Sequence, residues 1–295
     1  MTLQTAFEQH RRFLTRLAYR MLGSVSDAED IVQDAWLRWH EASGDEISNP
    51  RAYLAQVVTR LCLDQMKSAR SRREFYVGTW LPEPLVEKLG SAEVADDELD
   101  APIALMLALE RLSPLERAAF LLHDIFDMDF TEIAAMLERS EAACRQLAKR
   151  ARDHVRLDTP PRNKVSREEA ARFAEAFFKA SHQSDPTMLQ RLLAQDVVLH
   201  SDGGGKVQAV FKLIFGADKV ARFFARLSHA LALTRRNVST TSYEPVLING
   251  LPGYVSLENG QTLQATALDI RDGLIHAIYV VRNPDKLRHL QQPGL

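Results

Sequence analysis

The sequence predicts a multidomain protein, with two all-α domains followed by one α+β domain. Residues 1–155 are almost free of glycine and repeat apolar residues every three or four positions, which is typical of amphipathic helices. Residues 74–102 hold three prolines and an acidic run, which indicates a linker between two helical domains. Beyond a second linker at residues 158–166, one helical stretch is followed by several stretches of alternating apolar and polar residues, which are typical of strands.

The composition is that of an ordinary globular protein. The chain has 295 residues, a formal net charge of −2 and 46% hydrophobic residues, so the protein as a whole is not a basic nucleic-acid coat. Its two cysteines, Cys62 and Cys144, have no partner at metal-binding spacing, and two buried free thiols fit a reducing compartment. We find no signal-peptide pattern and no apolar run of membrane length. We therefore expect a cytoplasmic protein without a metal or another cofactor.

In the first helical domain, helix starts are marked by capping residues. Ser26 is followed three residues later by Glu29, which predicts a capping box at the start of the second helix. Pro50 suits the first turn of the third helix, which ends in the basic stretch "KSARSRR". The exposed face of the second helix is acidic and would repel DNA, so we expect it to bind a basic protein partner. This face holds Asp30, Gln33, Asp34 and Leu37.

The second helical domain has a helix-turn-helix pattern. Pro114 opens one helix, Asp129 and Glu132 predict a capping box at the next, and Ser140 predicts the N-cap of the last. The last helix is basic on the side away from its apolar stripe, which suits DNA. The alternative is a solvated amphipathic helix packed on a core. The polar residues that we expect to bind DNA are Arg145, Gln146, Lys149, Arg150 and Arg152.

These motifs together resemble a known family. "GSVSDAEDIVQDAWLRW" followed by "NPRAYLAQVVTRLCLDQMKSARSRR" resembles domain 2 of the extracytoplasmic-function (ECF) sigma factors of bacterial RNA polymerase. "LERLSPLERAAFLLHDIFDMDFTEIAAMLERSEAACRQLAKRAR" resembles their domain 4. "WLPEP", "SDGGGKV" and "VRNPDKL" resemble the subgroup with a C-terminal SnoaL-like domain, a cone of curved mixed sheet and helices. The resemblance divides the chain into sigma domain 2 (1–73), a linker (74–102), sigma domain 4 (103–157), a linker (158–166) and the SnoaL-like domain (167–295).

The resemblance implies roles for particular residues. The acidic face of the second helix falls where the family binds the β′ clamp helices of core RNA polymerase. The third helix falls where the family captures and binds the −10 promoter element, and the last helix of domain 4 falls where it recognises the −35 element. Two positions depart from the family pattern, because Leu61 replaces a common Asn and Glu138 replaces a common Gly. The expected −10 residues are Pro50, Arg51, Arg60, Asp64, Lys67 and Arg70.

The triple glycine in "SDGGGK" admits several interpretations. A phosphate-binding loop is disfavoured, because neither Ser nor Thr follows Lys206 and the next residues look extended; a turn between strands fits better. A catalytic pocket is a rival, since His200 and Asp202 share a strand face and could transfer protons. We favour regulation, in which this motif and the C-terminal "NPDKL" contact the sigma domains or the "WLPEP" linker. The residues expected in that contact are Trp80, Leu81, Pro82, Asp202, Gly203, Gly204, Gly205, Lys206, Asn283, Pro284 and Asp285.

The sequence therefore predicts an ECF sigma factor and not an enzyme, with no catalytic residues assigned. We expect it to bind core RNA polymerase and promoter DNA and to be a monomer when free, with its activity modulated by the C-terminal domain. Two alternatives stay open. One is a stand-alone helix-turn-helix regulator, and the other is a SnoaL-type cyclase or isomerase fused to a DNA-binding part.

Overall fold

The structure is a computed structural model that describes residues 3–42, 47–73, 76–89, 102–158, 166–182, 186–234, 241–258 and 261–291. The chain forms two compact units. The first contains Met1–Phe75 and Ile103–Pro160, and the second contains Tyr76–Pro102 and Pro161–Leu295. The expected acidic run from Glu93 to Asp100 lies outside the described residues.

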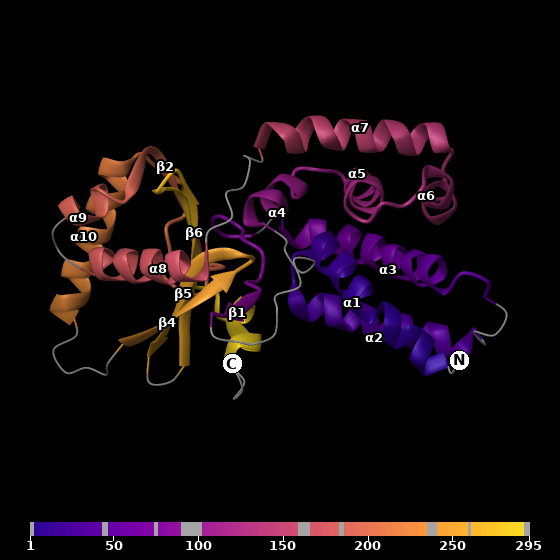
Figure 1. Ribbon diagram of the computed structural model, residues 1–295, viewed down its shortest axis with the longest axis horizontal. Coiled ribbons are helices and arrows are strands. Elements are labelled where there is room, and N and C mark those ends of the chain that lie inside the picture. The colour runs from indigo at the N-terminus through magenta and orange to yellow at the C-terminus, as the bar shows by residue number, and fades with distance from the viewer. Residues whose placement is uncertain are drawn as a thin grey trace. The chain divides into compact units, whose positions relative to one another are not determined.

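The first half of unit 1 is a bundle of three helices, α1 (Leu3–Leu22), α2 (Val25–Glu41) and α3 (Pro50–Arg73) (Figure 1). Pro50 is the first residue of α3, as predicted. The capping box at Ser26 and Glu29 is wrong, because α2 begins earlier and Ser24 is its N-cap. The Ser24 Oγ accepts a hydrogen bond from the Asp27 N–H at 3.1 Å.

The second half of unit 1 is built from short helices. They are α4 (Ile103–Leu109), α5 (Pro114–Phe120), the π-helix η3 (Leu121–Ile125), α6 (Phe130–Leu137) and the long α7 (Glu141–Asp158). Ser140 caps α7 as predicted, since its Oγ accepts from the Ala143 N–H at 3.2 Å. Asp129 is the N-cap of α6 but makes no side-chain capping bond, so the predicted box with Glu132 is absent. The capping box that does form joins Ser113 and Glu116 at α5.

The two halves of unit 1 are packed together through buried side chains. Arg117 on α5 is buried and donates hydrogen bonds to the Leu109 carbonyl and, at 2.7 Å, to the Met21 carbonyl at the end of α1. Phe126 is also buried, and its ring meets the Phe13 ring of α1 edge-on, with centroids 5.2 Å apart. These contacts join helices that are about a hundred residues apart in sequence.

Unit 2 is a mixed sheet of seven strands in the order β1-β4-β5-β6-β7-β2-β3. Only the β2–β7 pair is parallel within this sheet, and the other neighbours are antiparallel. The strands are β1 (Val86–Lys88), β2 (Leu193–Asp202), β3 (Ile214–Phe215), β4 (Thr241–Ile248), β5 (Leu251–Glu258), β6 (Gln261–Arg271) and β7 (Leu274–Val281). Strand β1 lies in the segment that the sequence predicted as a linker, so that prediction is wrong for Val86–Lys88.

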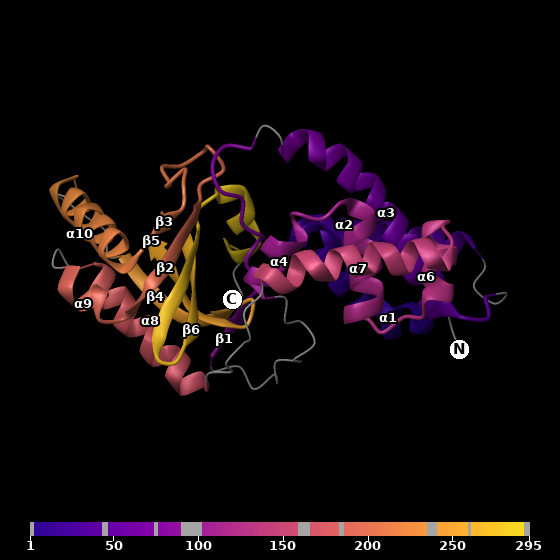
Figure 2. The same cartoon turned by 90° about the horizontal axis from the view of Figure 1, so that it is seen from above.

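Helices cover one face of this sheet. They are α8 (Arg167–Ser181), α9 (Pro186–Gln190) and α10 (Ala217–Thr234), and Figure 2 shows them on the same side of the strands. The core between the helices and the sheet includes Phe177, Val197, Leu199 and Tyr254. Val197 and Leu199 of β2 point into this core. Because side chains alternate along a strand, every second residue from Val198 onwards points to the other face of the sheet. That other face carries Val198, His200 and Asp202.

Candidate functional site

Helix α2 presents the predicted acidic face to solvent. Asp30, Gln33, Asp34 and Leu37 are all exposed, and Leu37 retains 54% of its accessible surface. The opposite side of α2 is buried in the bundle, through residues such as Ile31 and Val32. An exposed leucine among carboxylates is suited to a partner that offers both an apolar contact and positive charge.

Helix α3 carries the six residues predicted for −10 binding, and two of them contact the second half of unit 1. Arg60 donates from Nη2 to Glu138 Oε1 at 2.6 Å. Arg51 donates to the Phe126 carbonyl at 3.4 Å, and its guanidinium lies 4.8 Å from the centre of the Phe13 ring. These contacts therefore occupy two cationic side chains for which the family resemblance implies binding to the −10 element.

The other residues of this group are less engaged. Lys67 pairs with Asp64 at 2.8 Å on the exposed side of α3, and both side chains are 73% exposed. Pro50 is half-buried at the start of the helix. Arg70 lies within α3, but its side chain is outside the described part.

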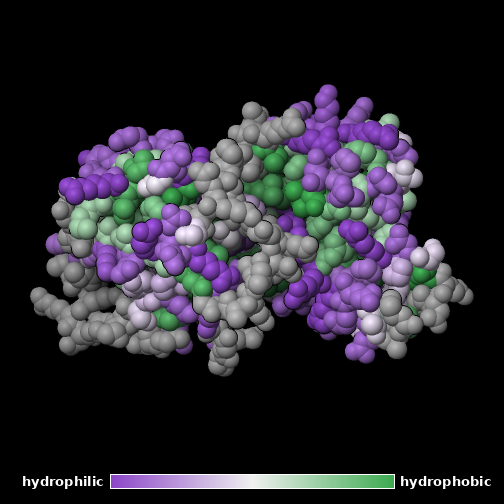
Figure 3. Space-filling model, in the orientation of Figure 1, coloured by the Kyte–Doolittle hydropathy of each residue, from purple (hydrophilic) through white to green (hydrophobic). Residues whose placement is uncertain are grey.

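Helix α7 exposes most of the polar residues predicted for −35 binding. Its buried stripe is Cys144, Ala148, Ala151 and Val155, and Ala143 and Leu147 are half-buried beside it. Figure 3 shows hydrophilic side chains over this helix. The polar residues on the outer side are Arg145, Gln146, Lys149 and Arg150, whereas Arg152 is half-buried and pairs with Asp124 at 2.6 Å.

The turn between α6 and α7 contains Glu138 in a left-handed conformation, with φ 53° and ψ 49°. A non-glycine residue there costs about 1 kcal/mol relative to glycine. Glu138, which stands where the family commonly has Gly, therefore occupies a position with a left-handed backbone. Glu138 is the residue that pairs with Arg60, so the strained position also supplies a charged contact.

In unit 2, Asp202 at the end of β2 is fully buried and binds the segment before β1. Its carboxylate accepts hydrogen bonds from the Tyr76 hydroxyl at 2.5 Å and the Leu81 N–H at 2.8 Å. It also accepts from the Gly204 N–H at 3.0 Å and pairs with Lys286 Nζ at 2.8 Å. A buried carboxylate needs such partners, because an unpaired charge is costly in the interior.

Lys286 adds aromatic contacts to the same site. Its ammonium lies 4.4 Å from the centre of the Trp80 ring and 5.0 Å from that of Tyr76, within cation–π range, and it donates to the Leu81 carbonyl. Burial, together with the hydrogen bond to the Asp202 carboxylate and its charge, raises the pKa of the Tyr76 hydroxyl well above its usual range. Leu81 is fully buried and Pro82 is buried, while Trp80 is half-buried.

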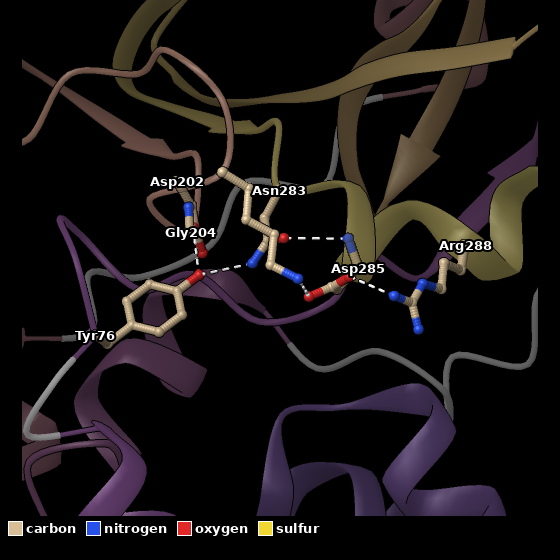
Figure 4. A network of polar contacts seen from close by, with 7 residues as sticks. Tyr76, Asp202, Gly204, Asn283, Asp285 and Arg288 are labelled. Atoms are coloured by element: carbon tan, nitrogen blue, oxygen red, sulfur yellow. Dashed lines mark hydrogen bonds and ion pairs between the residues drawn. The ribbon is translucent and has the colours of Figure 1, made fainter.

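The glycine turn and the C-terminal motif meet beside Asp202 (Figure 4). Asn283 Nδ2 donates to the Tyr76 hydroxyl at 3.0 Å, and the Asn283 Oδ1 accepts from the Asp285 N–H at 3.1 Å. Lys206 forms an ion pair with Asp285, and with Arg288 nearby it lowers the pKa of the Asp285 carboxyl. Pro284 is exposed at the start of the 3-10 helix η4 (Pro284–Gln291).

The glycines are needed for this close approach. A Cβ on Gly204 would lie 2.2 Å from the Asn283 Nδ2, and one on Gly205 would lie 3.1 Å from the Val77 Cβ. Both residues have positive φ angles, and a Cβ on Gly203 would lie 2.5 Å from the Val207 carbonyl oxygen. No helix follows the motif directly, because the next element is β3, so the structure supports a turn and not a phosphate loop.

Comparison with known proteins decides the family. Residues 6–72 match the family model Sigma-70 region 2, and residues 103–155 match Sigma-70, region 4. The chain is 40% identical to the ECF RNA polymerase sigma factor SigJ of Mycobacterium tuberculosis, over 95% of this chain and 91% of SigJ. The chain belongs to the ECF sigma factors of RNA polymerase. These proteins recognise promoters and initiate transcription.

Two further similarities extend over nearly the whole chain. It is 32% identical to the probable ECF sigma factor SigI of the same species, over 98% of this chain and 96% of SigI. The crystal structure of M. tuberculosis SigJ matches with a TM-score of 0.72 and 36% identity, covering 98% of this chain and 99% of that chain. The expected fold class is thereby confirmed, with two helical sigma regions and a C-terminal mixed sheet. The match to Sigma-70 region 2 disfavours the alternative of a stand-alone helix-turn-helix regulator, because such a protein has no region 2.

The surroundings of His200 and Asp202 argue against the alternative that these two residues form a catalytic pocket. Asp202 is fully engaged by Lys286, Tyr76 and backbone donors, so it is not a free base. Burial lowers the pKa of His200 to about 4, and its Nδ1 is buried without a hydrogen-bond partner. A histidine held neutral and unpaired with a carboxylate is poorly suited to proton transfer at neutral pH.

The ranges that the structure describes contain neither a metal-binding cluster nor a membrane-spanning helix. Among their residues, no three or more His, Cys, Asp or Glu side chains are grouped so that they could hold a metal ion. None of the helices in the described ranges is long and apolar enough to cross a membrane.

Sequence reasoning missed two residues of the Asp202 site. Tyr76 is not among the residues expected in this contact, although it binds Asp202. Lys286 stands in the quoted motif "NPDKL", directly after the three residues that were selected. The sequence in and beside the motifs contains a lysine, Lys286, together with two aromatic residues and the carboxylate of Asp202. This combination could have indicated a buried cation at the site.

Proposed function

We propose that this sigma factor binds the β′ clamp helices of core RNA polymerase through the exposed face of α2. The support is the combination of Asp30, Asp34 and Leu37 on one solvent-facing side. We assign the −10 element to α3 and the −35 element to α7. Because bacterial polymerase and promoters are in the cytoplasm, the proposal places this protein there, as a monomer when free.

The free protein should bind promoter DNA weakly. Arg60 is paired with Glu138 and Arg51 with the Phe126 carbonyl, so two −10 groups must leave these contacts before they reach DNA. The −10 and −35 elements lie about 25 base pairs apart, which is roughly 85 Å of duplex. With α3 in contact with the turn before α7, unit 1 must open to occupy both elements. Core polymerase would stabilise the open form by binding both regions at once.

We further propose that the C-terminal unit modulates initiation by holding the linker. The observation that carries this proposal is Asp202, which binds Tyr76 and Leu81 of the segment between the two sigma regions. Residues 74–102 span about 100 Å when fully extended, but residues 90–102 alone reach only about 45 Å. A linker bound to the sheet therefore limits how far regions 2 and 4 can separate.

The test is run-off transcription with core polymerase and the full-length chain. Asp202→Asn removes the charge that binds Lys286 and weakens the acceptor for Tyr76 and Leu81. We expect more transcript from Asp202→Asn than from the wild type. The matched control is Asp196→Asn on the same strand, whose carboxylate is 83% exposed. Equal transcript from wild type, variant and control would contradict modulation through the linker.

A further inference from the structure

The polar residues on the outer side of α7 differ in how firmly they are held. The Arg145 guanidinium lies 5.2 Å from the centre of the Phe130 ring and donates from Nη2 to Glu141 Oε2 at 2.7 Å. Gln146 and Lys149 are exposed, and their side chains make no hydrogen bond to any residue that the structure describes. Two described contacts therefore favour one orientation of Arg145, whereas no described contact restrains the Lys149 side chain.

The contacts that hold Arg145 are themselves supported. Thr131 on α6 donates from its hydroxyl to Glu141 Oε1 at 2.9 Å, so both carboxylate oxygens of Glu141 are used. The Phe130 ring stacks on His123, with ring centres 4.0 Å apart, and the His123 Nδ1 lies 3.0 Å from the Met128 carbonyl oxygen. Residues from η3, α6 and α7 thus converge on one guanidinium.

This arrangement suits direct recognition of a base. An arginine that reads guanine must align two donors with the O6 and N7 atoms, and alignment before binding reduces the side-chain entropy lost on binding. A contact to phosphate has no such requirement, because charge alone gives most of its energy. Glu141 accepts from one N–H of the Arg145 guanidinium. The other N–H groups make no hydrogen bond to a described residue, so they can donate to a base.

We propose that Arg145 is the base-recognition residue of α7 and that Glu141, itself held by Thr131, is a positioning residue for −35 sequence selectivity. This inference depends on the proposed −35 role of α7. Lys149 then contributes phosphate affinity that is independent of sequence. Arg152 has a structural role, because it pairs with Asp124 and is only 30% exposed.

The proposal separates selectivity from affinity. Replacing Glu141 by Ala removes alignment from Arg145, which lowers discrimination between bases. The same change removes a negative charge beside the DNA, which raises affinity for every sequence. A purely structural role for Glu141 would instead lower binding to all sequences evenly.

The experiment is transcription by core polymerase with the full-length chain on promoter libraries in which each −35 position is randomised in turn. Arg145→Ala should reduce the preference at one or two adjacent positions by about tenfold. Glu141→Ala should reduce the preference at those same positions, and the double variant should match Arg145→Ala alone. Glu141→Gln should retain part of the preference, because its amide oxygen still accepts from Arg145. Lys149→Ala, the control, should lower transcript from all library members evenly.

A second pair of variants tests the support of Glu141. Thr131→Val removes the hydroxyl and should weaken the same base preference, whereas Thr131→Ser should keep it. The inference is overturned if Glu141→Ala leaves the preference at the wild-type level or lowers all promoters evenly. If the wild-type holoenzyme shows no −35 preference at all, the proposed role of α7 fails as well, and that result is distinct from the first two.

Discussion

Arg60 and Glu138 form an ion pair of 2.6 Å between the middle of α3 and the left-handed turn residue that precedes α7. The pair joins a predicted −10 residue to the helix-turn-helix of region 4. Because the Glu138 side chain is 73% exposed and that of Arg60 45%, the pair itself stabilises unit 1 only weakly, by about 0.2–1 kcal/mol. Its consequence for function is that Arg60 is occupied when DNA is absent.

Replacing Glu138 by Gly should raise the affinity of the free protein for promoter DNA. The change releases Arg60 and removes a negative charge, so we expect about two- to fivefold tighter binding at low salt, by fluorescence anisotropy. Stability should change by less than about 1 kcal/mol, because relief of the left-handed strain offsets the lost ion pair. The control is Asp127→Gly, which also has a positive φ of 55° but is exposed and has no partner across the unit among the described contacts. Unchanged or weaker binding by Glu138→Gly would exclude a restraining role for the pair.

Replacing Arg117 by Met should strongly destabilise unit 1. Arg117 is 1% exposed, donates to the carbonyls of Leu109 and Met21, and pairs with the Glu110 carboxylate at 2.7 Å. The Leu109 carbonyl would keep the Leu112 N–H as a donor, but the Met21 carbonyl and the Glu110 carboxylate would lose Arg117. We expect a loss of about 3–5 kcal/mol in the free energy of unfolding, measured by urea denaturation. Arg150→Met on the exposed side of α7 is the control and should change stability by less than about 0.5 kcal/mol. A small effect at Arg117 would mean that the two halves are not joined by this side chain.

Gly204 and Gly273 offer a matched comparison of the glycine turn. Both have positive φ, but a Cβ on Gly204 meets Asn283 at 2.2 Å, whereas one on Gly273 meets nothing within 4 Å. Each Gly→Ala change should cost about 1 kcal/mol from the backbone. Gly204→Ala should also displace Asn283 from Tyr76, so hydrogen exchange at residues 76–89 should accelerate in this variant only. Equal exchange in the two variants would contradict a role of the turn in holding the linker.

His200 predicts a pH dependence of unit 2. Burial lowers its pKa from 6.5 to about 4, so between these values the unfolded chain binds a proton that the folded chain does not. Stability should therefore fall as pH decreases from 6.5 towards 4, by up to about 3 kcal/mol from this group, and be unaffected above pH 7. His200→Gln should remove this part of the dependence of the urea midpoint on pH, whereas His229→Gln, exposed on α10, should not. The same pH dependence in wild type and His200→Gln would show that another group is responsible.

Much of the fold could be predicted from local sequence patterns, and the differences have local or long-range causes. The start of α3 was predictable because Pro50 needs no partner beyond its own helix. The start of α2 was misplaced by two residues, because Gly23 takes a positive φ and leaves Ser24 extended, in the N-cap conformation. Strand β1 has only three residues and follows two prolines, and its pairing with β4 depends on residues about 160 positions later, so no local pattern indicated it.

In the candidate sites too, features set by local sequence could be predicted and features set by long-range packing could not. The exposed faces of α2 and α7 followed from helical periodicity, since each lies opposite an apolar stripe. The buried role of Lys286 did not, because lysine is normally exposed and its burial depends on Asp202 and two aromatic rings. The contacts of Arg60 and Arg51 with region 4 depend on how two helical halves pack, which motif spacing does not specify.

Transcription from a promoter library by core RNA polymerase, with and without this protein, tests directly whether the protein acts as a sigma factor. We predict new transcript starts that depend on −35 and −10 sequences, and we predict that Asp30→Ala with Asp34→Ala reduces both these transcripts and the capture of core polymerase. No new starts with the wild-type protein would show that it does not direct initiation, and undiminished capture by the double variant would show that the acidic face of α2 does not bind core polymerase.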